Sequence, residues 1–188
     1  DSIPEAVARL WQEEQAAWYQ QHGMNPAWAS DPDRRHEAMQ AVPRADRDEF
    51  QRAQQRKFLV ELDQCHGSCV LDAANGPVSE SLLHFHGQRV WTGDFVVMPN
   101  HVHVLVQPFP GVVLEEWLYS VKRHSATRIL QDPTLAARLH LRRGHLWQTE
   151  SFDRVVRGSS ELARTRRYIA GNPDKLRPGT FALKQMNW

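Results

Sequence analysis

The chain has 188 residues, 41% of them hydrophobic, which is enough to build one main domain with a core. It contains no run of 18 or more apolar residues, and its acidic, proline-containing start does not resemble a secretory signal, so we expect a cytoplasmic protein without a membrane segment. With two cysteines a disulfide framework is excluded, which fits a reducing compartment.

The formal net charge of +1 hides an asymmetry along the chain. Up to Leu118 there are 9 Lys and Arg against 17 Asp and Glu, a balance of −8. The remaining residues have 14 against 5, a balance of +9. The C-terminal part therefore carries the field that attracts a polyanion, and nucleic acid becomes a candidate partner.

The first third of the chain favours helices. Ser2 can cap a helix over residues 4–21, in which apolar residues recur at roughly helical spacing. Residues 25–44 contain three prolines and indicate an irregular stretch or short helical pieces. A second, more polar helix is predicted over residues 45–63.

The rest of the chain alternates between strands and helices. The predicted order is a turn at 75–77, a short helix ending at Gly87, antiparallel strands at 89–98 and 102–106, a basic amphipathic helix at 114–130, a strand at 147–157, and a last helix from Ser159 or Ser160 to Asn172. This order suits an α+β domain with helices over an antiparallel sheet.

A pair of histidines lies on the second predicted strand. Because side chains alternate along a strand, His101 and His103 project side by side while Val102 points into the core. Two neutral imidazoles on one face make half a metal site, although an arbitrary pair of this spacing is more often structural. His84 and His86 have the same spacing but lie at a predicted helix end, where they do not share a face, so we assign them to structure or solvent.

The two cysteines surround a further histidine. Cys65, His66 and Cys69 could supply at most three zinc ligands, and no distant pair of ligands completes them. A packing or surface role is the better interpretation, because free cysteine commonly acts as a small buried hydrophobe.

Tyr168 and Asn172 lie four residues apart on the last predicted helix and so share a face. An ion on the two histidines could take the Asn172 carbonyl as a further ligand, which would bring Tyr168 close to it. A phenol needs help to attack, and a basic setting from Arg164, Arg166 and Arg167 would favour its phenolate. The alternative is that Tyr168 is one more half-buried aromatic residue.

Several strings of residues, in this order, resemble a known family. They are Met98-Pro99-Asn100-His101-Val102-His103-Val104-Leu105-Val106, Leu146-Trp147-Gln148, Phe152-Asp153-Arg154, Arg167-Tyr168-Ile169 and Asn172-Pro173. They look like the REP-associated tyrosine transposases, bacterial relatives of the single-strand insertion-sequence transposases with one catalytic tyrosine. The resemblance covers roughly the last 130 residues.

The resemblance implies an HUH endonuclease domain: a ferredoxin-like α+β fold with an antiparallel sheet and helices on one face. Such an enzyme cleaves and rejoins single-stranded DNA near palindromic hairpins through a 5′-phosphotyrosine intermediate, in DNA transposition and recombination. It implies that His101 and His103 are the HUH pair, Tyr168 the nucleophile and Asn172 the polar metal ligand. The family's ion is usually Mg²⁺ or Mn²⁺.

The same resemblance divides the chain into an N-terminal helical segment, residues 1–66, and an HUH transposase domain, residues 67–188. In the family an additional strand normally precedes the segment Asp1-Ser2-Ile3-Pro4, and this chain begins where that strand would finish. The alternative function is therefore a catalytically impaired protein that binds structured DNA. A further rival is a small-molecule hydrolase in which a zinc-bound water attacks.

Six side chains are candidates for contact with DNA. We expect basic residues to hold phosphates and Trp147 to stack on unpaired bases. The basic residues are Lys122, Arg123, Arg154, Arg157 and Arg167. Whether the protein is a monomer or a dimer stays open.

Overall fold

A computed structural model describes residues 3–30, 32–64, 69–138, 146–148 and 151–187. The chain forms two compact units, Asp1–Gly67 and Ser68–Trp188, and each is described by itself. None of the helices in these ranges is both long enough and apolar enough to cross a membrane.

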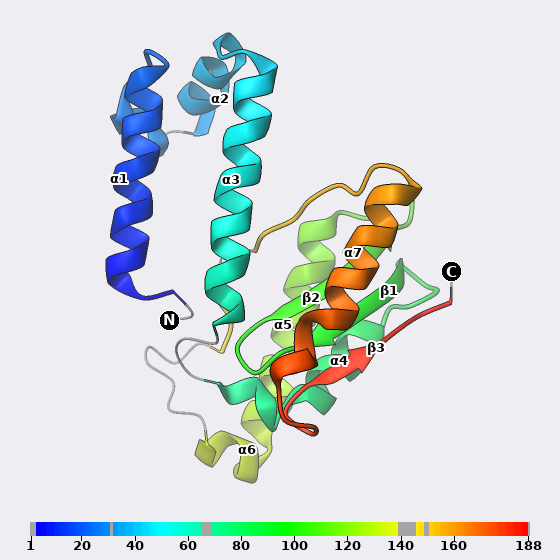
Figure 1. The fold of residues 1–188 in the computed structure, drawn as a ribbon. Helices are drawn as coiled ribbons and strands as arrows, with labels where there is room; N and C mark the ends of the chain where they lie inside the picture. The colour runs from blue at the N-terminus through cyan, green and yellow to red at the C-terminus, as the bar shows by residue number, and fades with distance from the viewer. Residues whose placement is uncertain (1–2, 31, 65–68, 139–145, 149–150, 188) are drawn as a thin grey trace. The chain divides into compact units, whose positions relative to one another are not determined.

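The first unit is helical (Figure 1). Its elements are α1 (Glu5–Gln21), the 3-10 helix η1 (Pro26–Ser30), α2 (Pro32–Ala41) and α3 (Arg44–Asp63). The helices predicted over residues 4–21 and 45–63 are confirmed, and the stretch between them consists of short helical pieces, as expected. Ser2, the expected cap of α1, lies outside the described residues.

Aromatic packing joins the helices of this unit. The Trp18 and Phe50 rings stack with centroids 4.0 Å apart, between α1 and α3. They cover a small buried cluster of Tyr19, Met24 and Val42. An ion pair between Lys57 and Glu14 links the same two helices farther along. The polar composition of α3 is thus compatible with packing because a few aromatic side chains supply the apolar contact.

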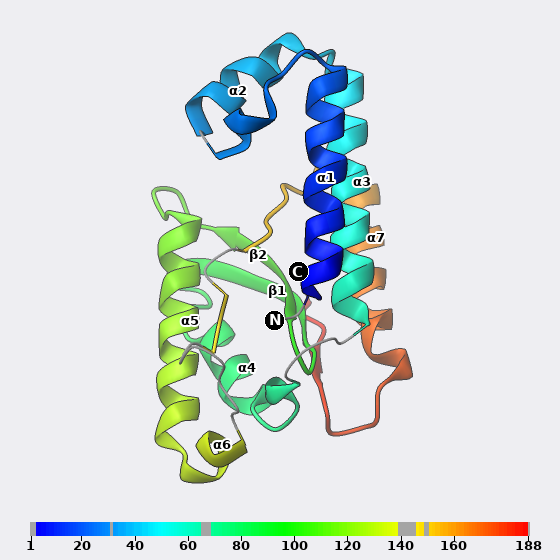
Figure 2. The ribbon, with the colours of Figure 1, turned by 90° about the vertical axis from the view of Figure 1, so that its left-hand side faces the viewer.

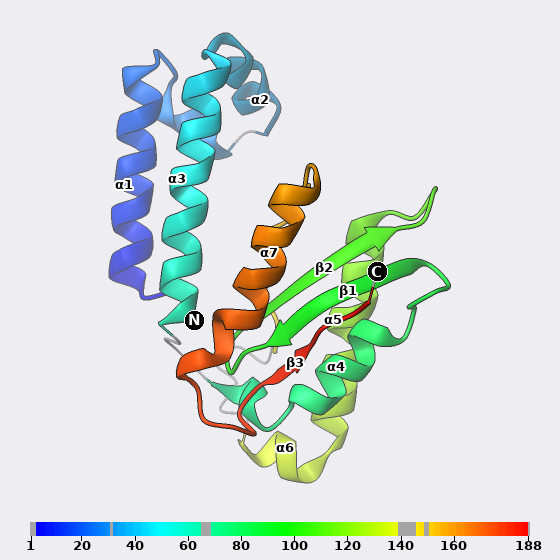
Figure 3. The same ribbon diagram turned by 45° about the vertical axis from the view of Figure 1, so that its right-hand side comes forward.

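The second unit has an α+β fold, as predicted. Its elements are η2 (Val70–Asp72), α4 (Asn75–Leu83), β1 (Val90–Val97), β2 (Val102–Pro108), α5 (Leu114–Gln131), α6 (Pro133–Arg138), α7 (Ser159–Gly171), η3 (Asn172–Lys175) and β3 (Ala182–Lys184). The three strands form an antiparallel sheet in the order β2-β1-β3, with β1 in the middle (Figure 3).

A bulge in β1 changes which side chains face which side of the sheet. Thr92 pairs with Val106, whereas Phe95 pairs with Val104, so β1 holds one residue more than β2 between these pairs. Such an extra residue shifts the alternation of side chains by one position. Before the bulge, the even-numbered residue Val90 faces the core formed with α4 and α5. After the bulge, the odd-numbered residues Phe95 and Val97 face that core.

Helices cover both faces of the sheet. On one face, Phe95 and Val97 pack in a core with residues of α4 and α5. On the other, Val96 and Met98 pack against Ile169 of α7. Figure 2 shows α5 on one side of the strands and α7 on the opposite side. The expectation of helices on one face is therefore corrected, because β1 is buried at seven of its eight positions and is covered on both faces.

The strand expected over residues 147–157 is wrong where the structure describes it. Residues 151–157 have no regular structure, and Phe152 and Val155 are 54% and 66% exposed. Adjacent β-branched residues favour a strand, but without a partner strand their backbone forms no ladder. The third strand is the short β3, which pairs Ala182 with Val97 and Lys184 with Phe95.

Two helix starts also differ from expectation. The residues predicted as a turn at 75–77 form the first turn of α4, where Pro77 is tolerated because early helical N–H groups have no partner within the helix. The N-cap of α7 is Gly158, with a φ of 81°, rather than Ser159 or Ser160. Only glycine adopts that conformation without strain.

Neighbouring residues of α5 offer a matched test of the core. Ile129 is fully buried in the sheet core, whereas Leu130 is 46% exposed. We expect Ile129→Ala to lower the free energy of unfolding by about 2–5 kcal/mol, because it removes buried methylene groups and leaves a cavity. Leu130→Ala should change it by less than about 0.5 kcal/mol. Chemical denaturation of both variants checks this, and equal losses would contradict the assigned face of α5.

Candidate functional site

The histidine pair lies at the start of β2. The Met98 N–H donates to the His101 carbonyl at 2.8 Å, which closes the tight connection from β1. His101 is buried and His103 half-buried, and their Nε2 atoms are 3.0 Å apart. The expectation that the two imidazoles project side by side is confirmed, because both follow the two-residue period of the strand. Val102, between them, packs against the opposite core.

Asn100 orients the first imidazole. Its Oδ1 lies 2.7 Å from Nδ1 of His101. The carbonyl oxygen can only accept, so Nδ1 of His101 carries the proton, and in the neutral ring Nε2 then keeps its lone pair. That lone pair points toward His103. The two rings thus offer nitrogen atoms at one place, as a divalent metal would require.

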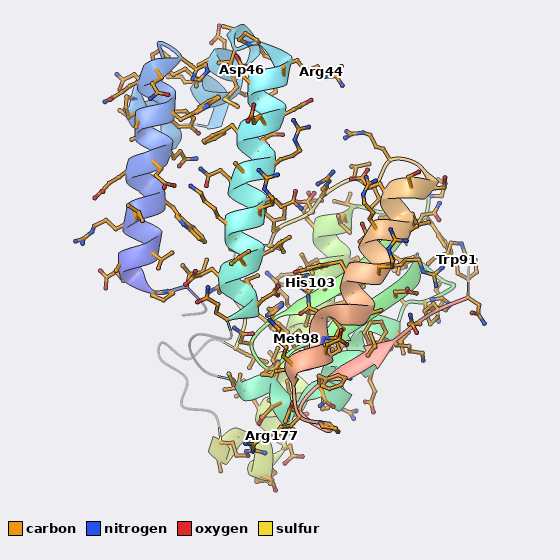
Figure 4. All side chains as sticks on the ribbon, viewed as in Figure 1. Arg44, Asp46, Trp91, Met98, His103 and Arg177 are labelled. Carbon is orange, nitrogen blue, oxygen red and sulfur yellow. The ribbon has the colours of Figure 1, made fainter. Side chains whose placement is uncertain are left out.

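Tyr168 reaches the same place from α7. Its phenolic oxygen lies 3.4 Å from Nε2 of His103, and the two rings meet edge-on with centroids 5.1 Å apart. The helix is held by Leu162 and Ile169, which pack on the sheet. Figure 4 shows the labelled His103 and Met98 on the side of the sheet that α7 covers. The structure therefore brings together the histidine pair and the tyrosine from distant parts of the sequence.

Asn172 follows one turn after Tyr168. It is the first residue of η3 and keeps helical angles, φ −58° and ψ −42°, so it stays on the Tyr168 side of the helix. Its amide Nδ2 is buried and has no hydrogen-bond partner among the described residues. A buried polar atom without a partner carries a cost that a ligand or water would relieve.

The expected basic setting around the phenol needs correction. The Arg166 guanidinium is bound to Asp94 and not directed at Tyr168. Its Nε donates to Asp94 Oδ2 at 2.8 Å, and its Nη2 donates to Oδ1 at 3.2 Å. Arg164 and Arg167 are exposed on the same helix. Arg164, four residues before Tyr168, is thus the arginine that shares its helix face, and Arg167 is the one next to it in the chain.

Three of the candidate DNA contacts belong to α5 and the segment beside it. Lys122 donates to the Gln148 carbonyl at 2.8 Å, and the Trp147 indole N–H donates to the Ser125 hydroxyl at 2.9 Å. Trp147 also packs against the sheet core, so its ring is engaged within the unit. Arg123 is exposed.

The other three lie with α7, on the opposite face of the sheet. Arg154 forms an ion pair with Glu161, and the Arg157 backbone N–H donates to the same carboxylate at 2.8 Å. Arg167 is exposed. Because α5 and α7 cover different faces, the six candidates form two groups, and only Arg167 lies on the same helix as Tyr168.

The remaining histidines and cysteines keep separate positions. His86 Nδ1 accepts the Thr92 N–H at 3.1 Å, while His84 is exposed and stacks on His124. The assignment of this pair to structure or solvent agrees with these contacts. Cys65 and His66 lie outside the described residues. Cys69 is exposed, and desolvation followed by the Asp72 charge raises the pKa of its thiol.

Comparison with known families agrees with this geometry. Residues 87–172 match the family described as Transposase IS200 like. The matched segment begins just before β1 and ends at Asn172, so it contains the histidine pair and the tyrosine. The match supports the transposase family and a DNA-processing function. No curated protein and no solved structure matches the chain.

Two carboxylates organise α7 and were not among the predicted site residues: Asp94, and Glu161, which the sequence places in the first turn of the last helix. Glu161 receives the Arg157 N–H and pairs with Arg154, and these contacts, the backbone one foremost, lower the pKa of its carboxyl. A glutamate in the first turn of a helix was a usable signal. A single aspartate within an apolar strand offered no signal for its partner.

The lowered pKa of Glu161 predicts a pH dependence of stability. A depressed carboxyl pKa in the folded state contributes stability above the unfolded pKa, and that contribution is lost as pH falls through the folded pKa. Glu161→Gln should therefore lower the thermal unfolding midpoint at neutral pH. The difference from the parent should shrink as the pH falls below about 4.3, the usual pKa of an unfolded glutamate, and should vanish once the carboxyl is protonated in the folded state as well. A difference that stays constant over this range would contradict the ionised contact.

Proposed function

We propose that the protein is a metal-dependent single-strand DNA endonuclease and strand-transferase of the HUH type, close to the REP-associated tyrosine transposases. The observation that carries this proposal is the 3.4 Å contact between the Tyr168 phenol and His103, within a segment similar to IS200-like transposases. We assign the activity to the domain of residues 67–188 and expect it in the cytoplasm.

The donor atoms fit a divalent metal. Two imidazole nitrogens 3.0 Å apart can both lie within ligand distance of one ion, and Asn100 fixes the tautomer that one of them needs. Asn172, one turn after Tyr168 on the same side of the helix, is the further residue that could give this ion a ligand, through its side-chain oxygen. A bound Mg²⁺ or Mn²⁺ would draw charge from the phosphoryl oxygens as a Lewis acid.

The reaction assigns a step to Tyr168. Its oxygen attacks the phosphorus of the scissile phosphodiester, so that an O–P bond to tyrosine forms while the bond from phosphorus to the 3′ oxygen breaks. The phenol gives its proton to solvent, and the departing 3′ oxygen takes one up. The DNA 5′ end stays on the enzyme as a phosphotyrosine, and attack by another 3′ hydroxyl reverses the step and joins the strands.

The substrate of this proposal is single-stranded DNA beside a palindromic hairpin. Arg167 lies next to the nucleophile in sequence and is exposed, so it is placed to meet the phosphate flanking the cleavage point. Arg154 and Arg157, before the same helix, extend this basic stretch. The α5 group would contact the hairpin only if the DNA passes around the edge of the sheet.

A denaturing gel tests the nucleophile. The protein is incubated with single-stranded DNA that carries the palindrome flanking its own gene, with Mn²⁺, with Mg²⁺ or with chelator. We expect a metal-dependent covalent adduct that Tyr168→Phe abolishes, because phenylalanine keeps the ring but lacks the attacking oxygen. Tyr119→Phe, at a tyrosine that is 65% exposed on α5, is the matched control and should retain the adduct.

The outcomes separate the rival functions. Binding of the hairpin without cleavage would replace the proposal by a protein that binds structured DNA. Cleavage that leaves no covalent adduct and that persists in Tyr168→Phe would point to a metal-bound water as nucleophile. If the protein neither binds nor cleaves the DNA, the transposase-like function is ruled out.

The DNA path gives a separate prediction. Arg167→Ala should weaken binding of single-stranded DNA and reduce the slope of log affinity against log salt by about 1, because one phosphate contact is lost. Arg128→Ala is the control, since that arginine is exposed on α5 and pairs with Glu80. Affinity measured by fluorescence anisotropy at several salt concentrations decides the matter. An unchanged slope in Arg167→Ala would move the DNA path away from α7.

A further inference from the structure

Asp94 is a buried carboxylate at the bulge of β1. It is fully buried, whereas its neighbours on the strand are apolar or small. Taking a carboxylate out of water costs several kcal/mol unless charge and hydrogen bonds compensate it. The bulge turns Asp94 toward the face that α7 covers, and all of its observed partners come from there or from the C-terminal segment.

Three segments meet at this carboxylate. Arg166 of α7 holds both carboxylate oxygens, at 2.8 and 3.2 Å, and also donates to the Met186 carbonyl at 3.0 Å. The Met186 N–H donates to Asp94 at 2.8 Å. The strand, the helix and the segment after β3 are therefore tied by four hydrogen bonds with fixed directions.

We propose that Asp94 and Arg166 are positioning residues that set α7, and with it Tyr168, against the histidine pair. The apolar contacts of Leu162 and Ile169 hold the helix on the sheet but do not fix its rotation. A forked guanidinium on a carboxylate fixes both rotation and height. The effect of this pair on cleavage rests on the proposed function.

The size of the effect follows from helix geometry. A slip of one residue moves a side chain about 1.5 Å along the axis and about 100° around it. The Tyr168 oxygen is 3.4 Å from His103, so even part of such a slip would break the contact. Misplacement of a reacting group by about 1 Å can cost on the order of 100-fold in rate.

The site of the pair on β1 supports this role. Val96, two residues after Asp94, is the partner of His103 in the register of the sheet. Tyr168 is two residues after Arg166 on α7. The ion pair is therefore two residues from the contact between tyrosine and histidine along both elements, which is about 3 Å along the axis of α7, so that a shift of the helix at Arg166 is passed on to Tyr168.

Fluorine NMR tests the positioning without DNA. The chain has three tyrosines, so 3-fluorotyrosine labelling gives three signals, which Tyr→Phe variants assign. The measurement is a double-mutant cycle between positions 166 and 103. The changes in the Tyr168 chemical shift caused by the two substitutions add up unless the two residues are coupled. His103→Gln should move the Tyr168 signal in the parent. The same change should move it much less in Arg166→Met, because the ring contact is already lost.

Controls separate position from charge and from folding. Arg128→Met, at the exposed pair with Glu80, should leave the His103 effect intact. Arg166→Lys, which keeps the charge but loses the fork, should retain part of it. Asp94→Asn keeps the shape of the carboxylate and provides a second route if Arg166→Met does not fold. The Tyr19 and Tyr119 signals report whether each variant is folded.

Single-turnover cleavage at saturating DNA gives the functional arm. We expect Arg166→Met to lower the rate about 10- to 100-fold while the affinity for DNA changes little, with partial rescue in Arg166→Lys. An intact His103 effect on Tyr168 in Arg166→Met and in Asp94→Asn would overturn the positioning role. A different result is that the parent protein cleaves no DNA while the effect of His103→Gln on the Tyr168 signal is still lost in Arg166→Met. That result would keep the positioning role and rule out the proposed function.

Discussion

The burial of β1 on both faces is the constraint on which the second unit depends. Seven of its eight positions are buried. A strand of this kind needs a layer on each side, and α4 with α5 supplies one layer while α7 supplies the other. The tyrosine helix is thus recruited to the sheet by packing, before any catalytic role is considered. The same alternation on β2 sends Val102 into one layer and His101 with His103 into the other.

The candidate site lies in the layer that α7 closes. The histidine pair, the Tyr168 phenol and the buried Asp94 all belong to it, whereas the α4 and α5 layer is an apolar core. Ser125 and Trp147 illustrate the difference, because their hydrogen bond joins a loop to α5 and stabilises that core. Because the main core lies in the other layer, α7 can be aligned on the sheet by a few polar contacts without loss of that core.

Local periodicity accounts for what the sequence predicts correctly. The two-residue spacing of His101 and His103 on a β-branched run, and the four-residue spacing of Tyr168 and Asn172, depend only on neighbours in the chain. The remaining features depend on tertiary partners. Val155 and Val156 have strand propensity but no described strand pairs with them, and the three-residue β3 is a strand because it pairs with β1. The sequence predicts that Arg166 favours the phenolate of Tyr168, but in the structure its guanidinium is bound to Asp94.

Under the proposed function, Tyr168, held beside His103, becomes covalently attached to DNA. Trypsin cleaves after Arg167 and after Lys175, so the peptide of residues 168–175 carries Tyr168 at its first position. Mass spectrometry of the digested reaction with metal and hairpin DNA tests the claim most directly. We expect a 168–175 peptide, or its longer form with a missed cleavage at Arg167, bearing a nucleotide through a 5′ phosphate on Tyr168. Cleaved DNA with that peptide unmodified, or with the nucleotide on another residue, would contradict it.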